Sequence, residues 1–150
     1  MGKNTAVPKG YQQIKLRIVF DVKQSLKRKA RIVACGDMTD PPREAVYSGV
    51  ASLQSLRIVC LLAELNGLKL TGGDVGNAYL EACTTEKVCV HAGPKFGPLE
   101  GHLLVIEKAL YGLRTSGARF HAKFADTLRA MGFMPTYADP NALWSQVFCW

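Results

Sequence analysis

The sequence contains no CxxC pair, no internal repeat, no low-complexity tract and no apolar run long enough to cross a membrane. Its five cysteines are odd in number, which argues against a disulfide framework and indicates a reducing compartment. The first residues are polar and basic and lack the apolar core of a signal peptide. A spanning helix would need ~20 mainly apolar residues. These absences predict a soluble protein inside the cell.

Paired metal-ligand spacing is also missing. Cys83, Cys89 and His91 lie near one another in the sequence, but their spacing is not that of a structural zinc site. We therefore expect no zinc there.

Acidic residues are scarce in the first 31 positions, where Asp21 is the single one. The whole chain carries a net charge of +7 and has a pI of about 9.3. Such a balance favours an anionic partner such as nucleic acid. The basic segment is either a solvated face or an arm that contacts phosphates. Its cations are Lys3, Lys9, Lys15, Arg17, Lys23, Lys27, Arg28, Lys29 and Arg31.

A length of 150 residues, 48% of them hydrophobic, suits one folded domain with a core. Alternating apolar residues predict a strand over 11–23, and RKARIVAC predicts a second over 28–35. The short KQSLK turn between them indicates a β-hairpin. Lys29 and Arg31 would then share one face, because strand side chains alternate. They would either lie on a solvated face or grip a triphosphate.

The remaining pattern predicts two long helices and several strands. Ser52 is expected to cap the first helix and Gly67 to end it, and Ser116 and Gly132 do the same for the second. Strands are expected at 68–75, 87–91 and 103–107, with a further strand starting near the end of the sequence. The element order indicates an α+β fold in which helices pack on one face of an antiparallel sheet. Residues 1–10 form a loose lead-in, and 11–150 form the domain.

The segment GDVGNAYL places a lone carboxylate, Asp74, at the end of an apolar run. An aspartate in that place is commonly a turn or cap residue. It can also hold a hard cation such as Mg²⁺, which binds through one or two carboxylates plus substrate phosphates. Gly76 leaves the backbone accessible, and Tyr79 can wall a pocket.

Five segments together resemble the reverse transcriptases of copia-type retrotransposons. GDVGNAYL resembles their first catalytic motif, and KARIVACG resembles their fingers motif KARLVA(R/K)G. KALYGLRTSGARFHAKF looks like LYGLKQAPRAWYEKF, and MGFMPTYADPNALW looks like the LGF…ADP segment. VYSGVASLQSLRIVCLLAELNGLKL fills the place of the family's SPVAK…IR…LALA helix. The segments run in order from about residue 11 to 145.

The resemblance implies a fingers and partial palm fold, with the fingers hairpin and loop at about 11–50 and a helix-rich fingers/palm part at about 51–150. It implies that Asp74 and the backbone of Val75 bind Mg²⁺ or Mn²⁺. Nucleotide-binding roles would fall to Lys29, Arg31, Gly76 and Tyr79, with Tyr79 excluding a ribose 2′-hydroxyl. Residues facing the template and the incoming base would be Tyr111, Gly112 and Ser116. The implied partners are an RNA or DNA template–primer and deoxynucleoside triphosphates, in a cytoplasmic particle or the nucleus.

Two departures from the family pattern affect this interpretation. Cys35 stands where the family has an arginine or lysine, and LRTSGARF replaces LKQAPRAW. The family's YxDD motif, which supplies further catalytic carboxylates, does not occur in the 150 residues. We therefore expect no polymerisation by this chain alone. It is either part of an RNA-directed DNA polymerase or a non-catalytic, nucleic-acid-binding remnant of one. An unrelated basic interaction module is the third alternative.

Overall fold

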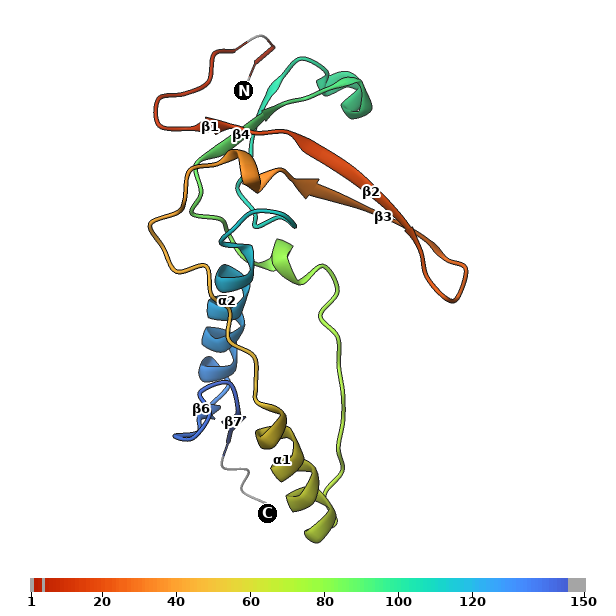
Figure 1. Ribbon diagram of the computed structural model, residues 1–150, viewed down its shortest axis with the longest axis vertical. Helices are drawn as coiled ribbons and strands as arrows, with labels where there is room; N and C mark the ends of the chain where they lie inside the picture. The colour runs from red at the N-terminus through yellow and green to blue at the C-terminus, as the bar shows by residue number, and fades with distance from the viewer. Residues whose placement is uncertain (1, 4, 146–150) are drawn as a thin grey trace. The chain divides into compact units, whose positions relative to one another are not determined.

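The computed structural model describes residues 2–3 and 5–145. The chain divides into two compact units, each of which combines two stretches of sequence (Figure 1). Unit 1 contains Met1–Tyr47 and Asn77–Phe120, and unit 2 contains Ser48–Gly76 and His121–Trp150. Residues far apart in the sequence therefore meet within each unit.

The predicted hairpin is confirmed in unit 1. Strand β2 (Leu16–Val22) pairs antiparallel with β3 (Arg28–Ala34). The Lys23 amide donates to the Lys27 carbonyl at 3.0 Å and closes the turn. Leu26 turns the chain with a φ of 59°, a left-handed conformation that non-glycine residues adopt rarely.

Unit 1 also contains a second sheet, which has three strands. Strand β1 (Gln12–Gln13) runs parallel to β4 (Val88–His91), which pairs antiparallel with β5 (Leu103–Val105). Three short 3₁₀ turns accompany these strands: η1 (Gly36–Met38), η2 (Ala78–Glu81) and η3 (Pro94–Leu99). One buried cluster, formed by Ile14, Ala34, Val88 and Leu113, joins both sheets.

Unit 2 contains helix α1 (Leu53–Leu65), most of helix α2 (Ser116–Ala130) and a small ladder of β6 (Met134–Pro135) with β7 (Leu143–Trp144). The Ser52 hydroxyl accepts the Ser55 amide at 3.0 Å, as expected of an N-cap. Gly67 and Gly132 follow α1 and α2 with φ of 61° and 89°, so both predicted helix ends are confirmed.

Three predictions about the fold are corrected. Residues 68–75 are exposed and form no strand, because a lone strand leaves its backbone groups without the neighbour they need, and no ladder among the described residues includes them. The strands of the described residues form three small sheets, one with a parallel pair, instead of one antiparallel sheet. Ser116 is the first residue of α2, and its hydroxyl donates to the Leu110 carbonyl at 2.6 Å instead of capping the helix. The α+β content itself is confirmed.

The described helices are too short or too polar to span a bilayer. The predicted final strand corresponds to β7, and whatever follows residue 145 lies outside the described residues.

Candidate functional site

Unit 1 contains an aromatic cluster with an arginine over one of its rings. The rings of Tyr79 and Tyr111 lie 4.7 Å apart, centre to centre, at an interplanar angle of 52°. Phe120 meets Tyr79 edge-on at 6.3 Å. The guanidinium of Arg31 lies 5.9 Å from the centre of the Tyr111 ring, within the range of a cation–π contact. Four residues from separate segments thus meet at one place.

Close backbone packing holds Tyr111 against the hairpin. The Ala34 amide donates to the Tyr111 carbonyl at 2.7 Å, and Val33 and Tyr111 form an isolated parallel bridge. Gly112 has a φ of 92°, and a Cβ there would lie 2.0 Å from the Ala34 carbonyl oxygen. A Cβ on Gly36 would lie 2.2 Å from the Gly112 carbonyl oxygen. Both glycines are therefore required where these two segments touch.

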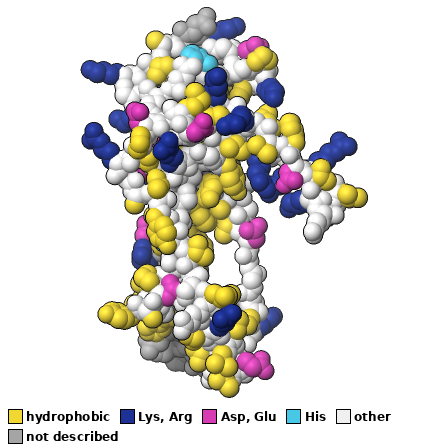
Figure 2. Space-filling model, viewed as in Figure 1, with side chains coloured by type: hydrophobic (Ala, Val, Ile, Leu, Met, Phe, Trp, Pro, Cys, Tyr) yellow, Lys and Arg dark blue, Asp and Glu magenta, His cyan; other side chains and the backbone are white. Residues whose placement is uncertain are grey.

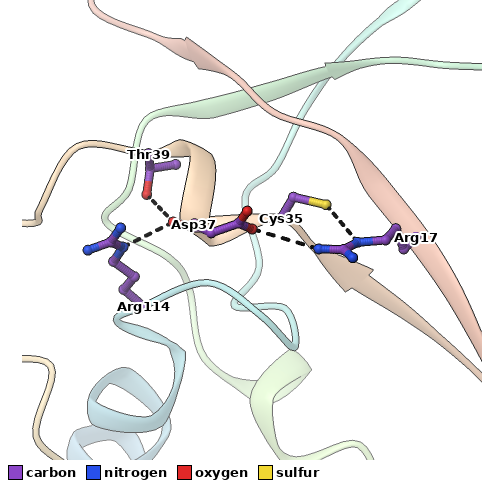
Figure 3. A network of polar contacts seen from close by, with 6 residues as sticks. Arg17, Cys35, Asp37, Thr39 and Arg114 are labelled. Atoms are coloured by element: carbon purple, nitrogen blue, oxygen red, sulfur yellow. Dashed lines mark hydrogen bonds and ion pairs between the residues drawn. The ribbon is translucent and has the colours of Figure 1, made fainter.

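The carbonyl of Gly36 is also the centre of a polar network (Figure 3). It accepts hydrogen bonds from Arg114 Nε at 3.0 Å and from the Thr39 hydroxyl at 2.8 Å. Alongside it, Arg17 Nε lies 3.1 Å from Cys35 Sγ and its Nη2 lies 3.8 Å from an Asp37 oxygen. The hydrogen bond and charge of Cys35, and then the charge of Asp37, raise the pKa of Arg17 above its usual value.

The loop that carries Tyr111 is fixed at its far end by Glu86. One carboxylate oxygen of Glu86 accepts both the amide of Thr115, at 2.9 Å, and its hydroxyl, at 2.7 Å. Thr115 and Ser116 are 1% and 2% exposed. A carboxylate at the start of a helix is stabilised by the unpaired amides there. The loop therefore has a defined shape before any ligand arrives.

Lys29 and Arg31 lie on the same face of β3, as strand alternation predicts. Lys29 is opposite Asp21 and Arg31 is opposite Val19 in the register. Arg31 reaches an Asp21 oxygen at 4.0 Å, and its Nε is buried without a hydrogen-bond partner among the described residues. A buried donor of this kind, beside the Tyr111 ring, is a group that an anionic ligand could satisfy.

Asp74, Val75 and Gly76 belong to unit 2 and are exposed. The structure brings Arg31, Tyr79, Tyr111 and Gly112 together within unit 1. Among the described residues, no group of three or more His, Cys, Asp or Glu side chains could hold a metal ion. A single exposed carboxylate does not fit a two-metal centre, which needs several oxygen ligands. Ser116 is buried, and its hydroxyl donates to the Leu110 carbonyl. Its contact with a template stays a prediction.

Unit 2 contains another carboxylate, that of Asp139, which is surrounded by hydrogen-bond donors. Asp139, 8% exposed, accepts the Ser55 hydroxyl at 2.6 Å and the amides of Ser52 and Asn141 at 2.8 and 3.0 Å. The Ser55 bond first, and then the two amides, lower its pKa from 3.8 to about 2. Asp139 therefore ties the start of α1 to the turn before β7.

Sequence reasoning missed Glu86, Phe120, Arg114 and Asp139 as residues that shape these sites. Phe120 repeats with Phe124 and Leu128 at helical spacing, which is typical of a helix but does not indicate the contact with Tyr79. Nothing in the local sequence pointed from Glu86 to Thr115.

Comparison with known proteins shows the family to which the chain belongs. A family model described as reverse transcriptase (RNA-dependent DNA polymerase) matches residues 3–148. The Pol polyprotein of the tobacco (Nicotiana tabacum) transposon TNT 1-94 is 26% identical over 147 residues, which cover 92% of this chain and 11% of that protein. The chain belongs to the reverse transcriptase family, among the copia-type Pol polyproteins.

Two yeast relatives support the same family assignment. The Gag-Pol polyproteins of the Saccharomyces cerevisiae transposons Ty1-DR4 and Ty1-LR2 are 29% and 31% identical over 132 residues, or 87% of this chain. The chain spans only 7% to 11% of the length of these relatives. No solved structure matches it significantly.

Proposed function

We propose that this chain forms the nucleotide-facing part of the RNA-directed DNA polymerase of a copia-type retrotransposon. The observation that carries the proposal is the cluster of Arg31, Tyr79 and Tyr111, fixed by the contact between Gly36 and Gly112. The family match supports the class of reaction. In this proposal residues 11–50 belong to the fingers and 51–150 to the fingers and palm.

Arg31 supplies the charge for the phosphates of an incoming deoxynucleoside triphosphate. Its buried Nε has no hydrogen-bond partner in the described part of the chain, and phosphoryl transfer depends mainly on positioning and charge stabilisation. Lys29, on the same face, adds a second positive charge. Gly76 contributes a backbone that a nucleotide can approach closely.

Tyr79 acts as the wall against which the sugar of the nucleotide lies. Its ring is held between Tyr111 and Phe120, so it has little freedom to move aside for a 2′-hydroxyl. Tyr111 and Gly112, together with Ser116 at the start of α2, face the base and the template strand, and Glu86 holds the loop before α2 in shape.

Asp74, with the Val75 backbone, serves as one metal ligand of the complete polymerase, in which Mg²⁺ or Mn²⁺ supplies charge for nucleotidyl transfer. The described residues do not form that centre. A template–primer of RNA and DNA is the partner, and the reaction takes place inside the cell.

Primer extension on an RNA template tests the proposal. The protein used is the polypeptide of the longer reading frame that contains this chain. We expect extension with deoxynucleotides, and its loss in Asp74→Asn with template binding retained. Tyr79→Ala should admit ribonucleotides. Extension by Asp74→Asn at the wild-type rate would remove Asp74 from the reaction.

A non-catalytic role in holding nucleic acid is the second candidate, favoured by the exposed Asp74 and by the basic hairpin. Figure 2 shows Lys and Arg side chains clustered along the β2–β3 hairpin, at the right of the view. Template binding without any extension by the longer polypeptide would favour this candidate.

A further inference from the structure

Helix α1 of unit 2 carries apolar side chains on every side, yet the rest of the unit covers little of it. Every leucine, isoleucine and valine of α1 is at least 48% exposed, and Ala63 is the one buried hydrophobic residue of unit 2 among those described. Figure 2 shows hydrophobic side chains at the surface in the region of α1, at the lower end of the view. A helix that is apolar all round is normally buried, so this surface indicates an interaction site.

One side of α1 is already occupied within unit 2. The Ser55 hydroxyl donates to Asp139 at 2.6 Å, and Ala63, two turns further along the helix, is 5% exposed. Successive helix residues are rotated by about 100°, so Arg57 lies about 200° around the helix from Ser55. Arg57 therefore points away from this contact, and the side of α1 that carries it is open.

We name this open side the α1 outer face. Its members are three, four or seven positions apart, the spacings that place side chains together on one side of a helix. They are Leu53, Arg57, Cys60, Leu61 and Glu64, and all are exposed. Neither Arg57 nor Glu64 forms an ion pair within the described part of the chain, and Cys60 is a free thiol. The two charges are therefore available to a partner.

The α1 outer face is complementary to itself when it is reversed. Arg57 and Glu64 lie equally far from its middle, which falls between Cys60 and Leu61. Two copies of α1 that pack antiparallel about this point place Arg57 of each copy opposite Glu64 of the other. A parallel pair would instead place arginine opposite arginine and glutamate opposite glutamate, and like-charge repulsion disfavours that arrangement. The charges thus favour one partner and one orientation.

We propose that the α1 outer face binds the same face of a second copy of this chain, antiparallel about a two-fold axis. Leu61 packs against Leu61 of the other copy at the axis, Cys60 lies beside Cys60, and an Arg57–Glu64 pair closes each end. Symmetric interfaces of this kind are the commonest in protein dimers. Apolar burial supplies the affinity, and the charge pairs set the orientation.

The length of α1 sets the strength of this association. Its 13 residues span only about 20 Å, so the contact area is small. Small interfaces are typical of transient complexes. We therefore expect a reversible dimer whose population rises with protein concentration. The proposal does not depend on the polymerase function.

Sedimentation equilibrium of the 150-residue chain over a series of concentrations tests the proposal. We expect a monomer–dimer equilibrium. Arg57→Glu places a glutamate opposite Glu64 of the other copy and should weaken self-association about tenfold or more, because like charges across an interface are strongly unfavourable. Glu64→Arg should weaken it to a similar extent.

The two single variants also provide a test of rescue. Mixed in equal amounts, Arg57→Glu and Glu64→Arg should form a heterodimer, since each altered residue then faces the opposite charge. The double variant Arg57→Glu/Glu64→Arg should dimerise like the wild type. Arg129→Glu makes the same change of charge on the exposed surface of α2, outside the α1 outer face, and should leave dimerisation unchanged. Circular dichroism of each variant checks folding.

The free thiol of Cys60 allows the register to be examined directly. A short bismaleimide should join two copies, and the linked peptides should contain Cys60 from both. Cys60→Ser should abolish this product, whereas Cys83→Ser, at an exposed cysteine of unit 1, should not.

A chain that stays monomeric at every concentration would overturn the proposal and would leave the α1 outer face to another part of a longer polypeptide. Aggregates without a defined dimer, equal losses with Arg129→Glu, or failure of the mixed variants to associate would also overturn it. So would crosslinks that exclude Cys60. Extension by the longer polypeptide judges the polymerase function separately, so either proposal can fail while the other stands.

Discussion

The proposed nucleotide site depends chiefly on the positive charge of Arg31, and the contact of this residue with phosphates can be tested separately. Arg31→Gln should weaken binding of a fluorescent deoxynucleoside triphosphate by about tenfold or more, because a charge-assisted hydrogen bond contributes ~1.5–3 kcal/mol. Arg28→Gln is the matched control, since Arg28 lies on the same strand but on the opposite face. Titration by fluorescence measures both. Equal affinities of the two variants would show that Arg31 does not contact the phosphates.

Gly112 should be among the least replaceable residues of unit 1. Alanine there would be strained at a φ of 92° and would also place its Cβ 2.0 Å from the Ala34 carbonyl oxygen. Gly10 isolates the first effect, because its φ is 83° but nothing lies within 4 Å of a Cβ. Gly10→Ala should cost about 1–2 kcal/mol for the left-handed conformation, and Gly112→Ala clearly more. Urea unfolding followed by circular dichroism compares them, and similar losses would disprove the close contact between Gly112 and Ala34.

The start of helix α1 should respond to acid through Asp139. The folded-state pKa of about 2 lies below the ordinary value of 3.8. The carboxylate therefore contributes stability that is complete above about pH 4 and is lost as the pH falls through 2. Asp139→Asn should lower the unfolding temperature at pH 7 and should no longer differ from wild type near pH 2.

Asp126→Asn controls for the loss of any carboxylate. Asp126 lies on α2, exposed, and pairs only at the surface with Arg129. Such a pair contributes little to stability, so this variant should follow the wild-type curve. Thermal unfolding at pH values from 2 to 7 provides the comparison. A constant gap between Asp139→Asn and wild type over that range would show that the charge of Asp139 is not the cause.

The elements that the sequence predicted correctly are those specified by neighbours in the chain. Alternation gave the β2–β3 hairpin, and a serine before an apolar run with a glycine after it gave α1. The strand expected at 68–75 failed because a strand also depends on a distant partner, which a local pattern does not reveal. The parallel pairing of β1 with β4 was missed for the same reason.

The same distinction between local patterns and distant contacts applies to the residues of the candidate site. Motifs pointed to Arg31, Tyr79 and Tyr111, and the structure shows that these residues meet. The residues that hold them, such as Glu86 and Thr115, are 29 positions apart and belong to no motif. Supporting contacts of this kind depend on tertiary packing, and a single sequence does not contain them in readable form.

The exposed segment 68–76 is where we expect a protease to cleave the chain most readily. Residues 68–76 are exposed and belong to no ladder among those described, and backbone of this kind is readily bound by proteases. Limited trypsin digestion should therefore cleave after Lys69 before it cleaves after Lys29 or Arg31. Both of those residues lie within the paired strand β3.

The same digestion shows whether Asp74 stands in a formed strand. In the longer polypeptide, a partner strand beside residues 68–75 would satisfy their backbone groups and place Asp74 at a strand end. Cleavage after Lys69 should then slow by at least tenfold relative to the 150-residue chain, while cleavage after Lys87, outside that segment, should change little. Equally fast cleavage after Lys69 in both proteins would mean that the segment stays unpaired. Asp74 would then lack the fixed position that a metal-binding carboxylate needs.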